Sequence, residues 1–294
     1  MAKTNSDDAD ISQKLQELQS WFETNPNLPE NIEPIVLKRF LKCMFYDVEQ
    51  TKGIIELNYS MRNGNPKLFL ERNMEDEMTA KALRASDLLI MPGVTPERHK
   101  LILFRMTDLD PSSRNSVEES KIFFMMADAR FTMPDTLQGK ESESSEGNTF
   151  DDAEIADGDV QIVDINGYTM RHMARVSVFI MRVYMKFLQE AYPSRLRAMH
   201  MINCPPFLDR MVTIMKPFIR EEVYEMIHFH YEGLDSLYEC VPREMLPEEY
   251  GGNAGTIAEI KEHWLQTLRE KSGYLSDEKY WKVVSQNKSR WSWF

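Results

Sequence analysis

The sequence has few of the features that mark secreted, membrane-spanning or metal-binding proteins. Its 294 residues include only three cysteines, none in a Cys-x-x-Cys pair, which argues against a disulfide framework and a zinc site. No run of about 18 apolar residues occurs, so no transmembrane helix is expected. Residues 1–8 are polar and acidic and lack the apolar stretch of a signal peptide. These absences predict a cytoplasmic protein.

Catalytic motifs are also missing. The chain has no Gly-x-Ser-x-Gly elbow, phosphate-binding glycine loop, dinucleotide fingerprint or zincin motif. His228 and His230 are two residues apart, and on a helix this spacing turns them to different faces, so joint metal ligation is not expected. We expect His172 and His200 to be interior groups. The sequence therefore predicts a protein that is not an enzyme and holds no metal or cofactor.

The negative charge is concentrated in one segment. The formal net charge is −12, and residues 141–159 contain eight acidic residues but no Lys or Arg. Residues 139–157 are rich in serine and poor in aromatic residues, a composition typical of a mobile or disordered insertion. This insertion is either a solvated loop without function or a phosphorylated or partner-binding tether. The absence of a basic stripe disfavours nucleic acid as a partner.

Apolar spacing divides the chain into a helical part and an α/β part. Helical periodicity predicts helices at about 11–24, 31–43, 47–63 and 75–86. Strands then alternate with helices, which favours a mostly parallel sheet. Strands are predicted at 99–106, 159–165, 196–202 and 237–241, and helices at 116–131, 176–188, 206–218 and 256–271.

The predicted helix at 206–218 has a distinct apolar stripe, and Pro217 gives it a natural hinge. Methionine is enriched nearby, with nine of the 20 methionines between residues 170 and 226. Because methionine is unbranched and polarizable, it adapts to a variable apolar ligand. The stripe could also cover a solid core, and the methionines could fill gaps in it. The patterns alone leave both interpretations open.

Several motifs occur in an order that identifies a family by resemblance. They are Val36-Leu37-Lys38-Arg39-Phe40-Leu41, Asp164-Ile165-Asn166-Gly167-Tyr168, Lys216-Pro217-Phe218 and Leu246-Pro247-Glu248-Glu249-Tyr250-Gly251-Gly252. This order resembles the CRAL-TRIO lipid-binding family, in the branch that carries tocopherol and retinaldehyde. The resemblance implies an all-helical N-terminal domain, then a mostly parallel sheet with flanking helices and an apolar pocket closed by a gate helix. The expected divisions are a disordered 1–10, a helical domain 11–90, a lipid-binding domain 91–255 and a C-terminal helix and tail 256–294.

The resemblance also implies which residues contact the ligand. Gln161 shares a strand face with Val163 and is expected to supply the polar contact for a hydroxyl or carbonyl group. The expected set comprises Gln161, Val163, Met199 and Met201 on strands, Tyr184, Phe187 and Leu188 on the long helix, and Phe207, Leu208, Met211, Ile214, Met215 and Phe218 on the gate helix.

Positions that bind inositol phosphates in the family are partly replaced. In the phosphatidylinositol-exchanging branch, an acidic residue and a lysine stand where this chain has Ser194 and Met226. In the tocopherol-like branch, a basic cluster recognises phosphoinositides. Arg195 and Arg197 match its first pair, and Lys216 and Arg220 could partly substitute for positions that are lost at Glu222, Tyr224 and Met226. We therefore expect weak or absent phosphoinositide binding.

Together these features predict an intracellular carrier that binds and transfers a small hydrophobic ligand such as a tocopherol, retinoid, carotenoid or similar lipid. Burial of apolar area, at about 25 cal/mol per Å², supplies the affinity. We expect a cytoplasmic monomer with transient membrane association and, through the acidic loop, a protein partner. Two alternatives remain: a lipid-sensing scaffold or signalling protein acting through that loop, and phosphoinositide-linked lipid exchange.

Overall fold

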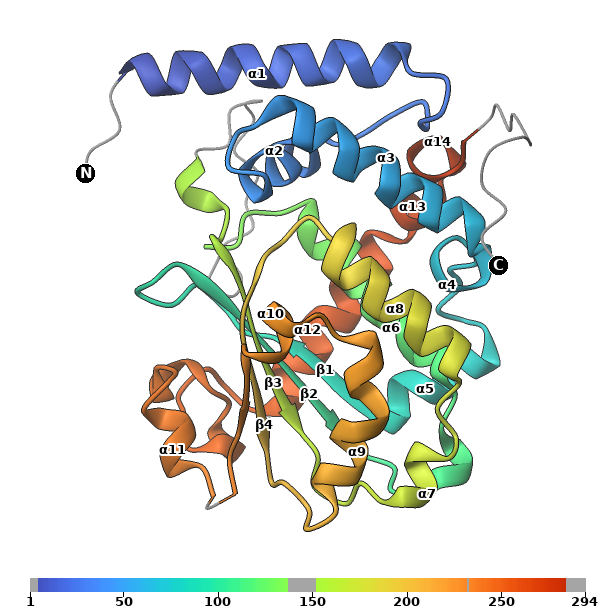
Figure 1. Ribbon diagram of the computed structural model, residues 1–294, viewed down its shortest axis with the longest axis vertical. Coiled ribbons are helices and arrows are strands. Elements are labelled where there is room, and N and C mark those ends of the chain that lie inside the picture. The colour runs from blue at the N-terminus through green and yellow to red at the C-terminus, as the bar shows by residue number, and fades with distance from the viewer. Residues whose placement is uncertain (1–4, 137–151, 232, 284–294) are drawn as a thin grey trace.

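The computed structural model describes residues 5–136, 152–231 and 233–283, and its N-terminal part consists of helices, the first three of which lie at one end of the molecule (Figure 1). Residues Pro34 and Pro66 stand in the first turns of their helices, and Asp47 caps the helix that follows it. The prediction of a helical N-terminal domain is confirmed. The helices are α1 (Asn5–Thr24), α2 (Pro34–Cys43), α3 (Val48–Gly64), α4 (Pro66–Phe69) and α5 (Glu77–Ala85).

The predicted disordered N-terminus is wrong for residues 5–10, because α1 begins at Asn5. Residues 1–4 lie outside the described part of the chain.

A five-stranded sheet lies at the centre of the second part. Its strands follow chain order, with β1 antiparallel to β2 and the other neighbours parallel. The mostly parallel sheet is therefore confirmed, but the strand predicted at 237–241 is wrong. A short apolar run does not distinguish strand from helix, and Asp235–Tyr238 forms helix α11 instead. The strands are β1 (Ser86–Ile90), β2 (His99–Met106), β3 (Gly158–Asp164), β4 (Leu196–Ile202) and β5 (Ile227–Phe229).

Helices and short turns connect and cover these strands. The helix predicted at 206–218 ends earlier, because Pro217 interrupts it and residues 216–218 form a 3-10 turn. The helices are α6 (Ser116–Phe131), α7 (Met170–Met173), α8 (Val178–Glu190), α9 (Leu208–Met215), α10 (Glu221–Tyr224), α12 (Ile257–Glu270), α13 (Ser272–Ser276) and α14 (Glu278–Trp281). The 3-10 turns are η1 (Pro111–Ser113), η2 (Asp152–Glu154), η3 (Lys216–Phe218), η4 (Arg243–Met245) and η5 (Glu248–Tyr250).

The C-terminal segment covers one face of the sheet. Tyr250 donates from its hydroxyl to Asp164 Oδ2 at 2.6 Å, and α12 adds apolar side chains to the core that contains Ile162. The Gly-Gly pair that follows Tyr250 is required by packing, since a Cβ at Gly252 would lie 2.0 Å from the Leu246 carbonyl oxygen. Two motifs that carry the family resemblance, around Asp164 and Tyr250, therefore hold the C-terminal segment on the sheet.

Part of the acidic insertion is fixed rather than mobile. The Lys42 ammonium group, buried on α2, lies 2.7 Å from Asp157 Oδ1 and donates to the Asp152 and Ile155 carbonyl oxygens. The hydroxyl of Tyr46 donates to Asp152 Oδ1 at 2.6 Å. The prediction of a mobile insertion is thus wrong for residues 152–157, because buried charge pairs hold them to the helical domain. Residues 139–151 lie outside the described residues.

Within the described ranges, no helix is long and apolar enough to cross a membrane. In the same ranges, no group of three His, Cys, Asp or Glu residues is arranged to hold a metal ion.

Candidate functional site

The second face of the sheet is apolar and incompletely covered. Alternate residues of a strand point to opposite faces, so Gln161 and Val163 of β3 lie opposite the face that carries Ile162 and Asp164. The register places Met199 and Met201 of β4 directly beside them. These four side chains are only half-buried, although β3 is the central strand of the sheet. Other protein groups therefore do not cover these four side chains completely.

The same face extends to both neighbouring strands. Ile102 and Phe104 of β2 pair with Gln161 and Val163, and Ile227 and Phe229 of β5 pair with the two methionines. The residues on β5 were missed because the last strand was predicted elsewhere. The alternation of apolar and histidine residues at 227–230 is the sequence signal that could have identified them.

Two of the three predicted contacts on helix α8 are half-buried, and both pack against the core that α8 shares with α6 and the N-terminal helices. Tyr184 and Leu188 are half-buried, and the Tyr184 ring lies 5.3 Å from the Phe123 ring of α6. Phe187 instead is fully buried, with ring centroids 4.7 Å from Phe69 and 5.0 Å from Phe124. Phe187 therefore belongs to the core between α8 and the N-terminal helices, and we remove it from the proposed ligand contacts.

The apolar stripe of α9 turns inward only in part. Leu208 and Met211 are buried, and Met215 is half-buried, as are Phe207 and Phe218 just beyond the two ends of the helix. Ile214, in contrast, is 42% exposed. Apolar burial thus holds one side of α9 on the molecule while one stripe residue faces solvent.

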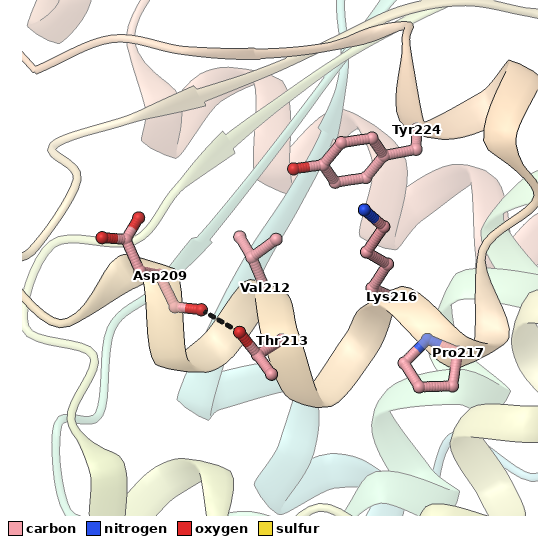
Figure 2. A pocket seen from close by; sticks show the side chains of 6 residues that line it. All are labelled: Asp209, Val212, Thr213, Lys216, Pro217 and Tyr224. Atoms are coloured by element: carbon pink, nitrogen blue, oxygen red, sulfur yellow. Dashed lines mark hydrogen bonds between the residues drawn. The ribbon is translucent and has the colours of Figure 1, made fainter.

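A hollow of about 470 Å³ lies beside the other side of α9 (Figure 2). Its volume is within the range of small-molecule pockets. In Figure 2 the Lys216 side chain extends from the end of α9 toward the Tyr224 ring of α10, and Nζ lies 5.0 Å from the ring centroid. None of the thirteen predicted ligand contacts lines this hollow. Its lining residues are Asp209, Val212, Thr213, Lys216, Pro217 and Tyr224.

The four basic residues of the predicted phosphoinositide patch are engaged with different partners. Arg195 and Arg197 both donate through Nε to the Asp157 carbonyl oxygen, at 3.3 and 3.2 Å. Arg220 forms an ion pair with Glu190 at 2.8 Å, and Lys216 lies against Tyr224 as described above. The fixed end of the acidic insertion therefore takes up donors that a phosphate would need.

Three histidines gather at the edge of the sheet. His228 lies within strand β5 and His230 comes directly after it, so the argument from helical spacing was wrong. His200 Nδ1 lies 2.9 Å from His230 Nε2, and His230 Nδ1 lies 2.7 Å from the Ser236 hydroxyl oxygen. Burial and the neighbouring imidazoles lower the pKa of His200 to about 4, and burial also lowers the pKa of His230.

The predicted interior positions of His172 and His200 are confirmed, since their exposed fractions are 1% and 2%. His172 accepts the backbone N–H of Thr169 at 3.0 Å and completes a capping box at the start of α7. Its role there is to position the chain beyond β3.

The fold defines a class of α/β protein in which a helical domain precedes a five-stranded, mostly parallel sheet with one incompletely covered apolar face. Residues 84–252 match the model of the CRAL/TRIO domain, and residues 7–79 match that of the Pinta-like UBA domain. The first match covers more than half of the chain, which therefore belongs to the CRAL/TRIO domain family.

Curated relatives support this assignment at low identity. The chain is 25% identical to the human (Homo sapiens) alpha-tocopherol transfer protein-like protein over 232 residues, which are 79% of this chain and 62% of the relative. It is 23% identical to rat (Rattus norvegicus) clavesin-2 over 92% of this chain and 76% of the relative. The solved structure titled "Crystal structure of Sfh5" matches with a TM-score of 0.49 and 11% identity, over 92% of this chain and 99% of that one. The chain thus spans less than two thirds of the length of the first of these relatives.

Proposed function

We propose that this protein binds a small hydrophobic ligand over the half-buried face of its sheet and carries that ligand between membranes, without catalysing a reaction. The observation that supports this most is the half-burial of Val163 on the central strand, beside Met201. An apolar ligand would remove the remaining exposed apolar area of these side chains from water, at about 25 cal/mol per Å². The incompletely covered face therefore offers a driving force for binding an apolar molecule.

We further propose that α9 is the gate of this site. Pro205 and Pro206 precede the helix, and Pro217 lacks the N–H that would continue it at the other end, so α9 is a separate helical segment that can move as a unit. Beyond the second terminus the chain is anchored, because Gln189 of α8 donates to the Phe218 carbonyl oxygen at 2.9 Å. The free motion expected is rotation of α9 about this anchored end.

The ligand proposed is an apolar molecule with one hydroxyl or carbonyl group. Gln161 is the polar side chain at the centre of the apolar face, and its amide can donate to or accept from such a group. Tocopherols, retinoids and carotenoids with polar ends fit this description. The printed name of one set of relatives refers to tocopherol, which supports the same class.

The test is to purify the protein under non-denaturing conditions and measure its mass by native mass spectrometry, then extract it with organic solvent and identify what is released. The proposal expects one apolar molecule per chain, lost on extraction and regained on incubation with the identified compound. A protein that is empty as purified and takes up none of these compounds would refute it.

A further inference from the structure

The carboxylate of Asp164 at the end of β3 joins three segments of the chain. Its Oδ1 accepts the Asn203 side-chain amide at 2.8 Å and the Asn166 backbone N–H at 2.9 Å. Its Oδ2 accepts the Tyr250 hydroxyl, as described above. Because Asp164 is buried, these hydrogen bonds replace the water that a carboxylate otherwise binds. Of the three donors, Asn203 is the one on the segment that leads from β4 to α9.

The backbone of Asn203 has a left-handed conformation, with a φ of 54°. Asparagine is one of the few residues other than glycine that adopt this conformation readily. Strand β4 ends at Ile202, so the backbone at Asn203 sets the direction in which the chain leaves the sheet toward α9 (Figure 1). The side-chain bond to Asp164 holds that direction, since it ties the first residue after β4 to the neighbouring strand.

The amino end of α9 is held by burial of Leu208 rather than by a helix cap. Phe207, at the N-cap position, makes no side-chain hydrogen bond to the first turn. Pro205 and Pro206, just before it, have no N–H to donate. In the described part of the chain, the α9 backbone makes its most extensive contact with η3, the turn that continues it at the other end. The position of the amino end therefore depends on where Asn203 directs the chain.

The bond between Asn203 and Asp164 lies beside the proposed ligand face. Asp164 directly follows Val163, and Asn203 comes two residues after Met201. Val163 and Met201 are paired in the register of β3 and β4. The bond therefore joins the ends of the two strands that carry these proposed ligand contacts, at the point where the chain turns toward α9.

We propose that Asn203 positions the gate: its hydrogen bond to Asp164 keeps α9 over the ligand face, and loss of this bond frees residues 203–207 to swing. The other end of α9 stays anchored through Gln189, so the helix turns away from the sheet about that end. This inference rests on the proposed carrier function, since it assigns a hinge to the same site. Asn203 acts through the position of α9 and is therefore a positioning residue.

The test is hydrogen–deuterium exchange of the whole chain, followed by mass spectrometry of peptides that cover α9. Exchange in a helix reports how often the helix opens, and one hydrogen bond shifts such an equilibrium by about three- to tenfold. Asn203→Gly loses the bond but keeps the left-handed backbone without strain. Its α9 amides should therefore exchange about three- to tenfold faster than those of the unchanged protein.

A purely structural role of Asn203 predicts a different result. If the bond broke only when the whole protein unfolds, local opening of α9 would be as frequent in Asn203→Gly as in the unchanged protein. The reference is α12, which packs in the core on the opposite face of the sheet. In the unchanged protein α9 should exchange faster than α12, because its opening is local. Asn203→Ala also disfavours the left-handed backbone, so α9 should exchange at least as fast there as in Asn203→Gly.

The control is Asn25→Ala in the helical domain. It removes another amide-to-carboxylate hydrogen bond, which joins Asn25 to Glu56 at 3.0 Å, and should leave α9 exchange unchanged. Three results would each overturn the role of Asn203: α9 exchange in Asn203→Gly equal to that of the unchanged protein, equal acceleration in Asn25→Ala, or α9 exchange no faster than that of α12 in the unchanged protein.

Ligand occupancy, measured by native mass spectrometry on the same samples, separates the two proposals. With phosphatidylcholine vesicles added as acceptors, Asn203→Gly should lose its apolar molecule about three- to tenfold faster than the unchanged protein, and equal rates would overturn the role of Asn203. A protein that carries an apolar molecule but shows unchanged α9 exchange in Asn203→Gly refutes that role and leaves the carrier function standing. A protein that takes up no apolar molecule, but whose α9 exchanges faster in this variant, supports that role and refutes the carrier.

Discussion

Arg62 of α3 and Asp128 of α6 form a bidentate ion pair across the boundary between the helical domain and the CRAL/TRIO domain, with both N–O distances 2.8 Å. Both side chains are buried, and Arg72 adds a second guanidinium to the same carboxylate. The Arg62 guanidinium also lies 5.0 Å from the ring centroid of Phe187, the α8 residue that was expected in the pocket. The helical domain thus fixes the position of α8, the helix beside the proposed ligand site.

We predict that Asp128→Asn strongly destabilises the protein. The substitution leaves two buried arginines without their carboxylate, and breaking a buried pair in this way costs about 3–5 kcal/mol. The free energy of unfolding, measured with urea, should fall by that amount. Glu262→Gln is the control, since its partner Arg269 is exposed and the loss should stay below about 1 kcal/mol. Equal effects of the two substitutions would show that the buried pair is not important for stability.

We predict that stability falls in mild acid because of His200. Its pKa is lowered to about 4 in the folded protein, against about 6.5 in the unfolded chain. Between these two values the unfolded chain binds more protons, so the free energy of unfolding decreases as the pH falls, by roughly 3 kcal/mol for a shift of this size. Above the pKa of the unfolded chain, His200 is neutral in both states and no stability is lost through its protonation.

The measurement is urea unfolding between pH 7 and pH 5 for the unchanged protein and for His200→Gln. The variant should show a smaller slope with pH, because His200 no longer contributes. Some slope should remain, since burial also lowers the pKa of His230. Parallel curves for the two proteins would contradict the assignment to His200.

We predict that Arg195 and Arg197 do not select phosphoinositides. Their side chains donate to the Asp157 carbonyl oxygen, which is part of the segment held by Lys42. Vesicles with phosphoinositide should therefore bind no more tightly than phosphatidylserine vesicles of equal surface charge, and Arg195→Ala/Arg197→Ala should bind both equally. Tight phosphoinositide binding that disappears in this variant would show the prediction to be wrong.

Regular periodicity allowed the first and last residues of several helices and strands to be predicted correctly. The helix at 116–131 and the strand at 196–202 have the predicted bounds, because long apolar patterns there are bounded by polar or proline-rich turns. Strand β1 was missed because Ser86 follows α5 without a turn, and β5 because it has only three residues. Short strands depend on their neighbours in the sheet, and the local sequence contains little of that information.

The contacts of the proposed site could be predicted from the sequence only where the regular geometry of strands determines which residues share a face. Gln161 and Val163 share a face because alternate strand residues always do, and register places the two methionines of β4 beside them. The position of Phe187 depends on Phe69 and Phe124, which are far away in the sequence. A helix with apolar residues on two sides does not reveal which side meets protein and which meets a ligand.

The central claim is that a ligand occupies the half-buried face of the sheet, and Val163→Trp tests it most directly. Indole carbon atoms at this central position should fill the space without removing a contact on the buried face that carries Ile162. We predict that native mass spectrometry finds one extractable apolar molecule on the unchanged protein and none on the Val163→Trp variant, while both unfold cooperatively in urea. Equal occupancy of the two folded proteins would contradict the proposed site.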